Sequence, residues 1–310
     1  MPYFSIIIPM YNREEFISRS INSCLEQNFN DFEIVVVDDG SSDRSVDVVR
    51  KYNDHRLKLI YHGVNRGVGP ARNTGLSIAN GNWIICLDSD DELLPGSLSV
   101  IYKRSLEVDE NIFRLLFMVK LDTGELSPEP PLKEETWDYI KYIKWMENSS
   151  CQRSETLPVV RRVTFDKVKY YNDRTLEGPY HMDFMKNFNA KSFPDVVRLY
   201  YHDAENQLTK PNIYRTIESA RNQAAGESLL LKNHGSALKI YAPRIFCKKL
   251  SSLATLHFLS GNRLKGIEYS FYSFSYNFFS IRNWAILLFG LLGAKPLAWL
   301  KCYSASYSKP

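Results

Sequence analysis

The chain has 310 residues, of which 44% are hydrophobic and 24% are charged. This is an ordinary globular composition, with room for one large α/β domain and a smaller second region. The five cysteines share no CxxC spacing, which excludes a typical zinc site and a disulfide framework and favours a reducing compartment. The first residues, MPYFSIIIPMYNREE, contain neither a basic region nor a long apolar run, so we expect no signal peptide there.

The net charge of +4 is unevenly distributed along the chain. Residues 232–310 contain eleven Lys or Arg and one acidic residue, Glu268, whereas residues 1–231 contain 28 basic and 34 acidic residues. We therefore expect the C-terminal part to favour an anionic surface. Nucleic-acid binding is not expected, because the basic residues there lie among apolar and aromatic residues rather than in a polar basic stretch.

Strands and helices alternate regularly over the first 120 residues. Apolar, β-branched runs predict strands at 4–10, 32–40, 57–62, 83–88 and 113–121. The segments between them predict helices at 12–25, 42–52, 70–79 and 95–108. In the first of these, Asn12 is expected to be the N-cap and Glu15 to complete a capping box. The alternation predicts a parallel, doubly wound α/β sheet, in which ligands bind beyond the carboxyl ends of the strands.

The rest of the chain is less regular. Residues 122–136 are rich in Pro and Glu and predict a mobile loop, and the stretch TWDYIKYIKWME predicts an amphipathic helix. Residues 158–202 mix short strands and helices, and from about residue 211 the pattern is helical to the end. We therefore expect an α/β domain over residues 1–210 and a helical, basic and aromatic region over residues 211–310.

Acidic residues lie at the ends of two of the predicted strands. Asp38 and Asp39 lie at the end of the second strand, and Asp88 ends the fourth strand, with Asp90 and Asp91 just after it. Residues two apart on extended backbone point to the same side, and paired carboxylates suit Mg²⁺ or Mn²⁺. The alternative for the second group is a solvated turn in which Asp91 caps the next helix.

The stretch NRGVGPARN, after the third predicted strand, combines glycines with Arg66 and Arg72. Backbone N–H groups and guanidinium groups in such a loop suit an anionic phosphate. No GxGxxG follows the first strand and no GKS or GKT occurs, which argues against a dinucleotide site and a P-loop.

In order and spacing, these motifs resemble those of glycosyltransferase family 2, of the type that makes bacterial surface polysaccharides. The resemblance covers roughly residues 4–100. It implies the GT-A fold, a doubly wound, Rossmann-like mixed sheet, with a nucleotide-diphosphate-sugar donor, a UDP-sugar being favoured, and Mn²⁺ or Mg²⁺. It also implies inverting transfer, by a single displacement, to a hydroxyl of a glycan or lipid-linked acceptor.

The resemblance further implies roles for individual residues, according to their positions in the motifs. For donor binding these are Pro9, Tyr11 and Asn12 at the nucleotide, Asp39 at the base, Asp88 at the ribose, and Arg66 and Arg72. For the metal they are Asp90 and, in the stretch YYHDAENQLT, His202, which could bind either the metal or a phosphate.

The catalytic base is the point at which the sequence departs from the family. The family has a Glu-Asp pair where TLEGPYHMDFMKNF has Tyr180 and His181. The acceptor hydroxyl must lose its proton as it attacks, so His181, Asp183 and Glu177 remain as alternative bases. An alternative reading is a nucleotide-sugar-binding protein without catalysis. Another is a nucleotidyltransferase on a related fold, although that class needs a Gly-rich loop after the first strand.

Residues 240–304 are rich in aromatic side chains. Their longest apolar run, WAILLFGLLGA, is shorter than the ~20 residues that a membrane span needs. An aromatic, basic helical region suits a peripheral position on an anionic membrane, with Trp284 and Trp299 at headgroup depth. We expect this to be the cytoplasmic, inner face of the plasma membrane. The alternative is a helical cap that packs on the first domain or on the second subunit of a homodimer.

Overall fold

The structure is a computed structural model, and it describes residues 1–148, 155–172, 177–202, 217–276 and 279–293. It divides into two compact units, which are described separately. Unit 1 comprises Met1–Tyr142 and Ser149–Glu205, and unit 2 comprises Ile143–Asn148 and Asn206–Pro310. The expected domain boundary after residue 210 lies outside the described residues and stays a prediction.

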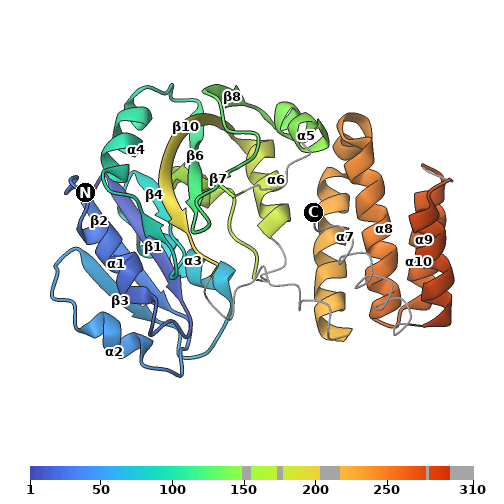
Figure 1. The fold of residues 1–310 in the computed structure, drawn as a ribbon, viewed down its shortest axis with the longest axis horizontal. Helices are drawn as coiled ribbons and strands as arrows, with labels where there is room; N and C mark the ends of the chain where they lie inside the picture. The colour runs from blue at the N-terminus through green and yellow to red at the C-terminus, as the bar shows by residue number, and fades with distance from the viewer. Residues whose placement is uncertain (149–154, 173–176, 203–216, 277–278, 294–310) are drawn as a thin grey trace. The chain divides into compact units, whose positions relative to one another are not determined.

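Unit 1 is built on one ten-stranded sheet (Figure 1). Its strands are β1 (Phe4–Met10), β2 (Phe32–Asp38), β3 (Leu57–Tyr61), β4 (Trp83–Cys86), β5 (Glu92–Leu93), β6 (Ile112–Leu121), β7 (Leu126–Ser127), β8 (Glu135–Trp137), β9 (Leu157–Arg161) and β10 (Asn189–Tyr200). They follow the order β3-β2-β1-β4-β9-β6-β10-β5, and β7 and β8 pair with β6 and β10.

The sheet is parallel at one side and mixed at the other. β3, β2, β1 and β4 are parallel neighbours, as the alternating pattern predicts. β9 is antiparallel to both β4 and β6, so β6 runs in the same direction as β1, and β10 is parallel to β6. β1 and β2 are buried at every position, which explains why FSIIIPM and FEIVVVD read as nearly continuous apolar runs.

Helices flank this sheet (Figure 1). They are α1 (Ile17–Leu25), α2 (Ser45–Arg50), α3 (Val68–Ile78), α4 (Ser97–Leu106), α6 (Glu177–Asn187) and the 3₁₀ helix η1 (Arg162–Asp166). A further helix, α5 (Tyr139–Asn148), begins in unit 1 and ends in unit 2. α3 packs against β1 and β2, and α4 packs against β10. A Cβ at Gly75 of α3 would clash with the side chain of Ile7, so this glycine lets α3 lie close to β1.

Two local expectations were wrong. α1 begins at Ile17 without a side-chain cap, so Asn12 and Glu15 form no capping box. Asn12 has a φ of 52°, and its side chain accepts a hydrogen bond from the backbone N–H of Ser42 instead. The predicted loop 122–136 contains β7 and begins β8, because these short segments pair with the edges of β6 and β10.

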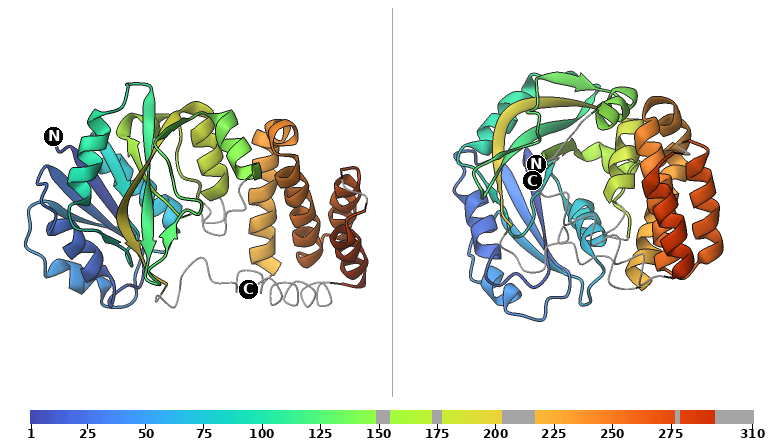
Figure 2. Two further views of the ribbon diagram at one scale, coloured as in Figure 1. Left: turned by 45° about the horizontal axis from the view of Figure 1, so that its top comes forward. Right: turned by 45° about the vertical axis from the view of Figure 1, so that its right-hand side comes forward.

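Unit 2 is helical in its described part, which confirms the expectation for those residues. Its helices are α7 (Ile217–Tyr241), α8 (Pro243–Leu259), α9 (Arg263–Phe274) and α10 (Ile281–Leu292), together with the end of α5. They lie side by side (Figure 2). A Cβ at Gly266 or at Gly290 would overlap the ring of Phe258, so these glycines allow α9 and α10 to pack on α8. Within the described ranges, no helix is both long enough and apolar enough to cross a membrane.

Candidate active site

The carboxyl ends of β1, β2 and β4 bring most of the predicted donor-binding residues to one edge of the sheet. Met10 pairs with Asp38, so β1 and β2 end at the same level, and β4 ends at Cys86 opposite Ile7, so that the residues after Cys86 continue towards the same edge. Pro9 is buried within β1, whereas Tyr11 just beyond it is 43% exposed. This edge is where open α/β sheets bind ligands.

Asn12 joins the loops that follow β1 and β2. Its backbone N–H donates to Ser41 Oγ at 2.9 Å, and its Oδ1 accepts from the backbone N–H of Ser42 at 2.8 Å. The backbone of Arg13 continues this connection by donating to Ser45 Oγ at 2.7 Å. The two loops are therefore held together by polar contacts within the protein itself.

Asp39 is the anchor of the Gly-rich loop after β3. Its Oδ1 lies 2.7 Å from His62 Nδ1 and accepts from the backbone N–H of Arg66 at 2.9 Å, and its Oδ2 accepts from that of Gly67 at 2.7 Å. His62 Nε2 in turn lies 2.8 Å from Thr74 Oγ1. Because Asp39 is 3% exposed, its first role in this structure is to fix the loop.

The two arginines of the stretch NRGVGPARN have different surroundings. Arg66 contributes its backbone N–H to Asp39, and its side chain is exposed. Arg72, on α3, is directed at two carboxylates: Nη2 donates to Asp88 Oδ1 at 2.9 Å, and Nη1 donates to Glu177 Oε1 at 2.5 Å. Its guanidinium also lies 5.2 Å from the ring centre of Tyr170. Arg72 thus links the end of β4 to the first residue of α6.

An arginine faces each carboxylate of the sequence DSDD. Besides Arg72 at Asp88, Arg13 Nε lies 3.7 Å from Asp90 Oδ2, and Arg198 Nε lies 3.0 Å from Asp91 Oδ2. These arginines offset the mutual repulsion of the three carboxylates.

The pKa values of Asp88 and Asp90 are shifted in opposite directions. Burial opposes ionisation of Asp88, but Arg72, Arg198 and Arg13 together outweigh it and hold the pKa of that carboxyl below its usual value. Burial and the neighbouring charge of Asp88 raise the pKa of Asp90. An added positive charge would therefore stabilise the ionised form of Asp90 more than that of Asp88.

The site suits a divalent cation only if a substrate supplies some of the ligands. Among the described residues, no three His, Cys, Asp or Glu side chains are grouped as a complete metal site. Mg²⁺, however, is usually held by one or two carboxylates together with substrate phosphates. The raised pKa of Asp90 shows that its surroundings disfavour its ionised form, and a bound cation would stabilise that form. Asp90, with Asp88 beside it, is the donor set that suits such an ion.

His202 lies after β10 and is half exposed. Its Nδ1 is 2.7 Å from Asp122 Oδ1, and its backbone N–H donates to Asp122 Oδ2 at 2.8 Å. A carboxylate on one imidazole nitrogen is a usual partner of metal-binding histidines, in which the other nitrogen is the ligand. The preceding residue, Tyr201, donates its backbone N–H to Asp91 at 3.0 Å, which brings this segment to the DSDD turn.

The three candidate bases lie on α6 in different surroundings. Glu177, at its first residue, contacts Arg72 and is 44% exposed at its side chain. His181 is 3.5 Å from Arg114 Nη1, and burial together with that guanidinium lowers its pKa to about 3. Asp183 accepts a hydrogen bond from the hydroxyl of Tyr171. Glu177 is linked, through Arg72, to Asp88 after the end of β4.

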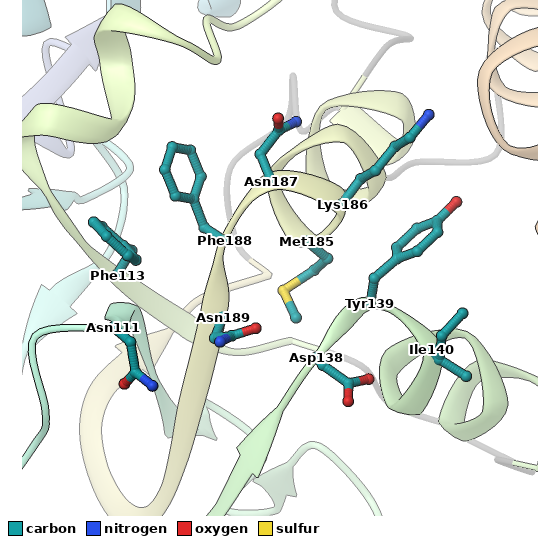
Figure 3. A pocket seen from close by; sticks show the side chains of 10 residues that line it. All are labelled: Asn111, Phe113, Asp138, Tyr139, Ile140, Met185, Lys186, Asn187, Phe188 and Asn189. Carbon is teal, nitrogen blue, oxygen red and sulfur yellow. The ribbon is translucent and has the colours of Figure 1, made fainter.

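A separate cavity of about 330 Å³ lies away from this edge (Figure 3). Asn111 and Phe113 beside the start of β6, Asn189 at the start of β10, and residues at the end of α6 line it. Because β6 and β10 run in the same direction as β1, their first residues lie at the opposite edge of the sheet from Asp39 and Asp88. The cavity contains none of the predicted site residues.

Comparison with known proteins shows which protein family the chain resembles. The profile described as Glycosyl transferase family 2 matches residues 5–143. The UDP-Glc:alpha-D-GlcNAc-diphosphoundecaprenol beta-1,3-glucosyltransferase WfgD of Escherichia coli is 43% identical over 96 residues, 31% of this chain and 38% of that protein. The GalNAc(5)-diNAcBac-PP-undecaprenol beta-1,3-glucosyltransferase of Campylobacter jejuni is 36% identical over 132 residues, 42% of each protein. Residues 5–143 therefore resemble a domain of glycosyltransferase family 2.

Solved structures share the fold over most of the chain. S. aureus TarS 1-349 in complex with UDP aligns with a TM-score of 0.55 at 21% identity, covering 87% of this chain and 89% of that one. The mannosyltransferase PcManGT from Pyrobaculum calidifontis, in complex with GDP-Man and Mn²⁺, aligns with a TM-score of 0.56 at 18% identity, covering 94% and 87%. The expected GT-A fold is confirmed. The chain spans only about two fifths of the length of the first curated relatives it matches.

Proposed function

We propose that the protein is a metal-dependent, inverting glycosyltransferase that moves a sugar from a nucleotide-diphosphate donor, a UDP-sugar, to a hydroxyl of a lipid-linked glycan. The observation that carries the proposal is that Arg72 joins Asp88 to Glu177 at the carboxyl edge of the sheet, with Asp90 two residues beyond Asp88. TarS is named with UDP, and the two glucosyltransferases are named for diphosphoundecaprenol or PP-undecaprenol acceptors.

In this proposal the donor lies across the ends of β1, β2 and β4. Asn12 and Asp39 hold the loops that border the nucleotide, and Arg66 and the Gly-rich loop face its phosphates. Asp90, Asp88 and His202 would hold a divalent cation. When bound, that ion supplies positive charge that stabilises the departing diphosphate.

Glu177 is the base that the geometry favours. The acceptor oxygen forms the new bond to the anomeric carbon, its proton passes to Glu177 Oε2, and the bond to the diphosphate breaks with its electron pair on the diphosphate. Arg72 occupies Oε1 and so orients the carboxylate. His181 is a poor candidate by comparison, because an imidazole with a pKa of about 3 hardly retains a proton at neutral pH.

We also propose a peripheral location at the inner face of the plasma membrane, where a lipid-linked acceptor would be reached. The excess of basic residues in unit 2 supports it.

Thermal unfolding of the full chain with a panel of nucleotide sugars, with and without Mn²⁺, tests the proposed donor. A ligand at about 100 times its Kd stabilises the folded state by about 2.7 kcal/mol. We expect UDP-sugars to raise the unfolding temperature, and more so with Mn²⁺. Stabilisation without release of UDP in the presence of acceptor would instead support a binding protein without catalysis.

A further inference from the structure

Unit 2 contains a basic cavity that the proposed transfer reaction does not use. Its volume is about 360 Å³, which is in the range of small-ligand pockets, roughly 300–1,000 Å³. α8 contributes Arg244 and Lys248 to its lining, and the start of α10 contributes Ser280 and Arg282. Among the described residues that line it, none is acidic.

The surroundings leave this cavity positively charged. Residues 232–293 contain eight Lys or Arg and a single carboxylate, Glu268. The nearby Glu147 accepts from the backbone N–H groups of Arg244 and Ile245 at 2.9 and 3.0 Å, so its carboxylate is engaged at the start of α8. It lies 3.9 Å from Arg244 Nε, which is too far for a close ion pair. The cavity therefore suits an anionic group such as a phosphate.

α10, which begins at this cavity, is apolar on two faces. Its inner face is buried in the core of unit 2 through Ile286 and Leu287. On the other face, Ile281 is 85% exposed, Leu288 is 57% exposed and Leu292 is 72% exposed. These positions recur at the helical spacing of three, four and seven residues, so they form one stripe, to which Leu291 also belongs.

The length of α10 determines how such a stripe could meet lipid. The helix has 12 residues, which correspond to about 18 Å at 1.5 Å per residue. The hydrocarbon core of a bilayer is about 30 Å thick. A helix of this length fits in the plane of the interface, with one apolar face in the acyl region and flanking cations at the headgroups.

We propose that this end of unit 2, defined by the α10 stripe (Ile281, Leu288, Leu291 and Leu292) and the cavity cations (Arg244, Lys248 and Arg282), is the docking surface for an anionic phospholipid membrane. The cavity receives the phosphate of a lipid headgroup, and the stripe enters the acyl region. The inference deepens the proposed membrane location and rests on it for the identity of the partner. A second copy of the chain fits less well, because a twofold interface would place these cations against themselves.

The test uses the full chain and sedimentation with vesicles, which requires neither donor nor turnover. Vesicles contain phosphatidylcholine alone or equal parts of phosphatidylcholine and phosphatidylglycerol. We expect binding to the mixed vesicles, and binding that high salt weakens without abolishing. The double variant Lys248→Gln/Arg282→Gln should bind about 30-fold more weakly, which corresponds to ~1 kcal/mol for each neutralised charge.

The apolar stripe is tested with Ile281→Asp/Leu288→Asp, which should reduce vesicle binding at least tenfold. Ile240→Asp, on α7, is the matched control, because Ile240 is 68% exposed but lies outside the stripe. It should bind as the unmodified chain does. Since all three positions are exposed, each variant should unfold at nearly the unmodified temperature.

Three results would overturn the proposal: no binding to mixed vesicles at low salt, equal loss of binding in the Ile240→Asp control, or a dimer in light scattering that Ile281→Asp/Leu288→Asp converts to monomers. The last would make the stripe a subunit interface. None of these results bears on sugar transfer to a soluble acceptor, so a failure here is distinguishable from a failure of the proposed reaction.

Discussion

Arg72 donates to Asp88 Oδ1 across 2.9 Å, and this ion pair ties α3 to the end of β4. The same guanidinium reaches Glu177 at the start of α6, a residue 105 positions further along the chain. Three segments distant in sequence thus meet at one side chain. The proposed donor and acceptor sides of the reaction are adjacent because of it.

Replacing Arg72 should therefore affect stability and activity together. We expect Arg72→Gln to lower the free energy of unfolding by about 1–3 kcal/mol, because two carboxylates lose their shared partner. The free energy of unfolding of Arg72→Lys should lie between those of the unmodified chain and Arg72→Gln, since an ammonium keeps the charge but cannot bridge two carboxylates in the same way. Urea unfolding measures the change. An Arg72→Gln protein as stable as the unmodified one would mean that the ion pairs contribute nothing.

Asp90 is expected to matter for the cation and not for the fold. Its pKa is raised by burial and by Asp88, so the ionised form is unfavourable in the metal-free protein. Asp90→Asn resembles the protonated form. It should leave metal-free stability unchanged or slightly higher, while Mn²⁺ no longer strengthens donor binding. Calorimetric titration with a UDP-sugar, with and without Mn²⁺, measures this, and an intact Mn²⁺ effect in the variant would assign the cation elsewhere.

His181 should make stability depend on pH. Its pKa in the folded protein is about 3, below the ordinary value of 6.5, so only the unfolded chain takes up a proton between these values. Stability is thus lost as pH falls from about 6.5 towards 3. His181→Gln should remove that part of the loss, by up to a few kcal/mol near the lower limit. Unfolding of both proteins across this pH range tests it, and parallel curves would show that His181 is not shielded from protonation.

Asp39 should be sensitive even to an isosteric change. Its carboxylate serves His62 and the backbone N–H groups of Arg66 and Gly67, and an amide can accept through one atom only. We expect Asp39→Asn to cost about 1–3 kcal/mol of stability and to weaken donor binding, because the Gly-rich loop loses its anchor. His62→Gln should weaken donor binding less. If Asp39→Asn bound donor normally, the loop would not depend on this anchor.

Local sequence patterns were enough for the first half of the fold. The continuous apolar runs of β1 and β2 and the aspartates after β2 and β4 follow from burial and from the strand-end rule, and both can be read along the chain. The capping box failed because Asn12 has two possible uses, and contact with Ser42, thirty residues away, prevails.

The positive charges around the aspartates could not be foreseen in the same way. Arg198 lies 107 residues beyond Asp91, and nothing in its own stretch of β10 distinguishes it from an exposed strand arginine. Only the pairing of β10 with β5 brings it to the DSDD turn. His62, by contrast, directly follows a predicted strand, and the strand-end rule could have suggested it.

The most direct test of the central claim compares the unmodified chain with Glu177→Gln, using a UDP-sugar, Mn²⁺ and a lipid-linked glycan acceptor. Product formation is followed by mass spectrometry, and donor affinity by calorimetry. We expect transfer by the unmodified chain and a rate lower by about 10²–10⁴-fold in Glu177→Gln, with donor affinity nearly unchanged. His181→Gln should retain most of the activity. Donor binding without transfer by the unmodified chain, or an active Glu177→Gln beside an inactive His181→Gln, would contradict the account.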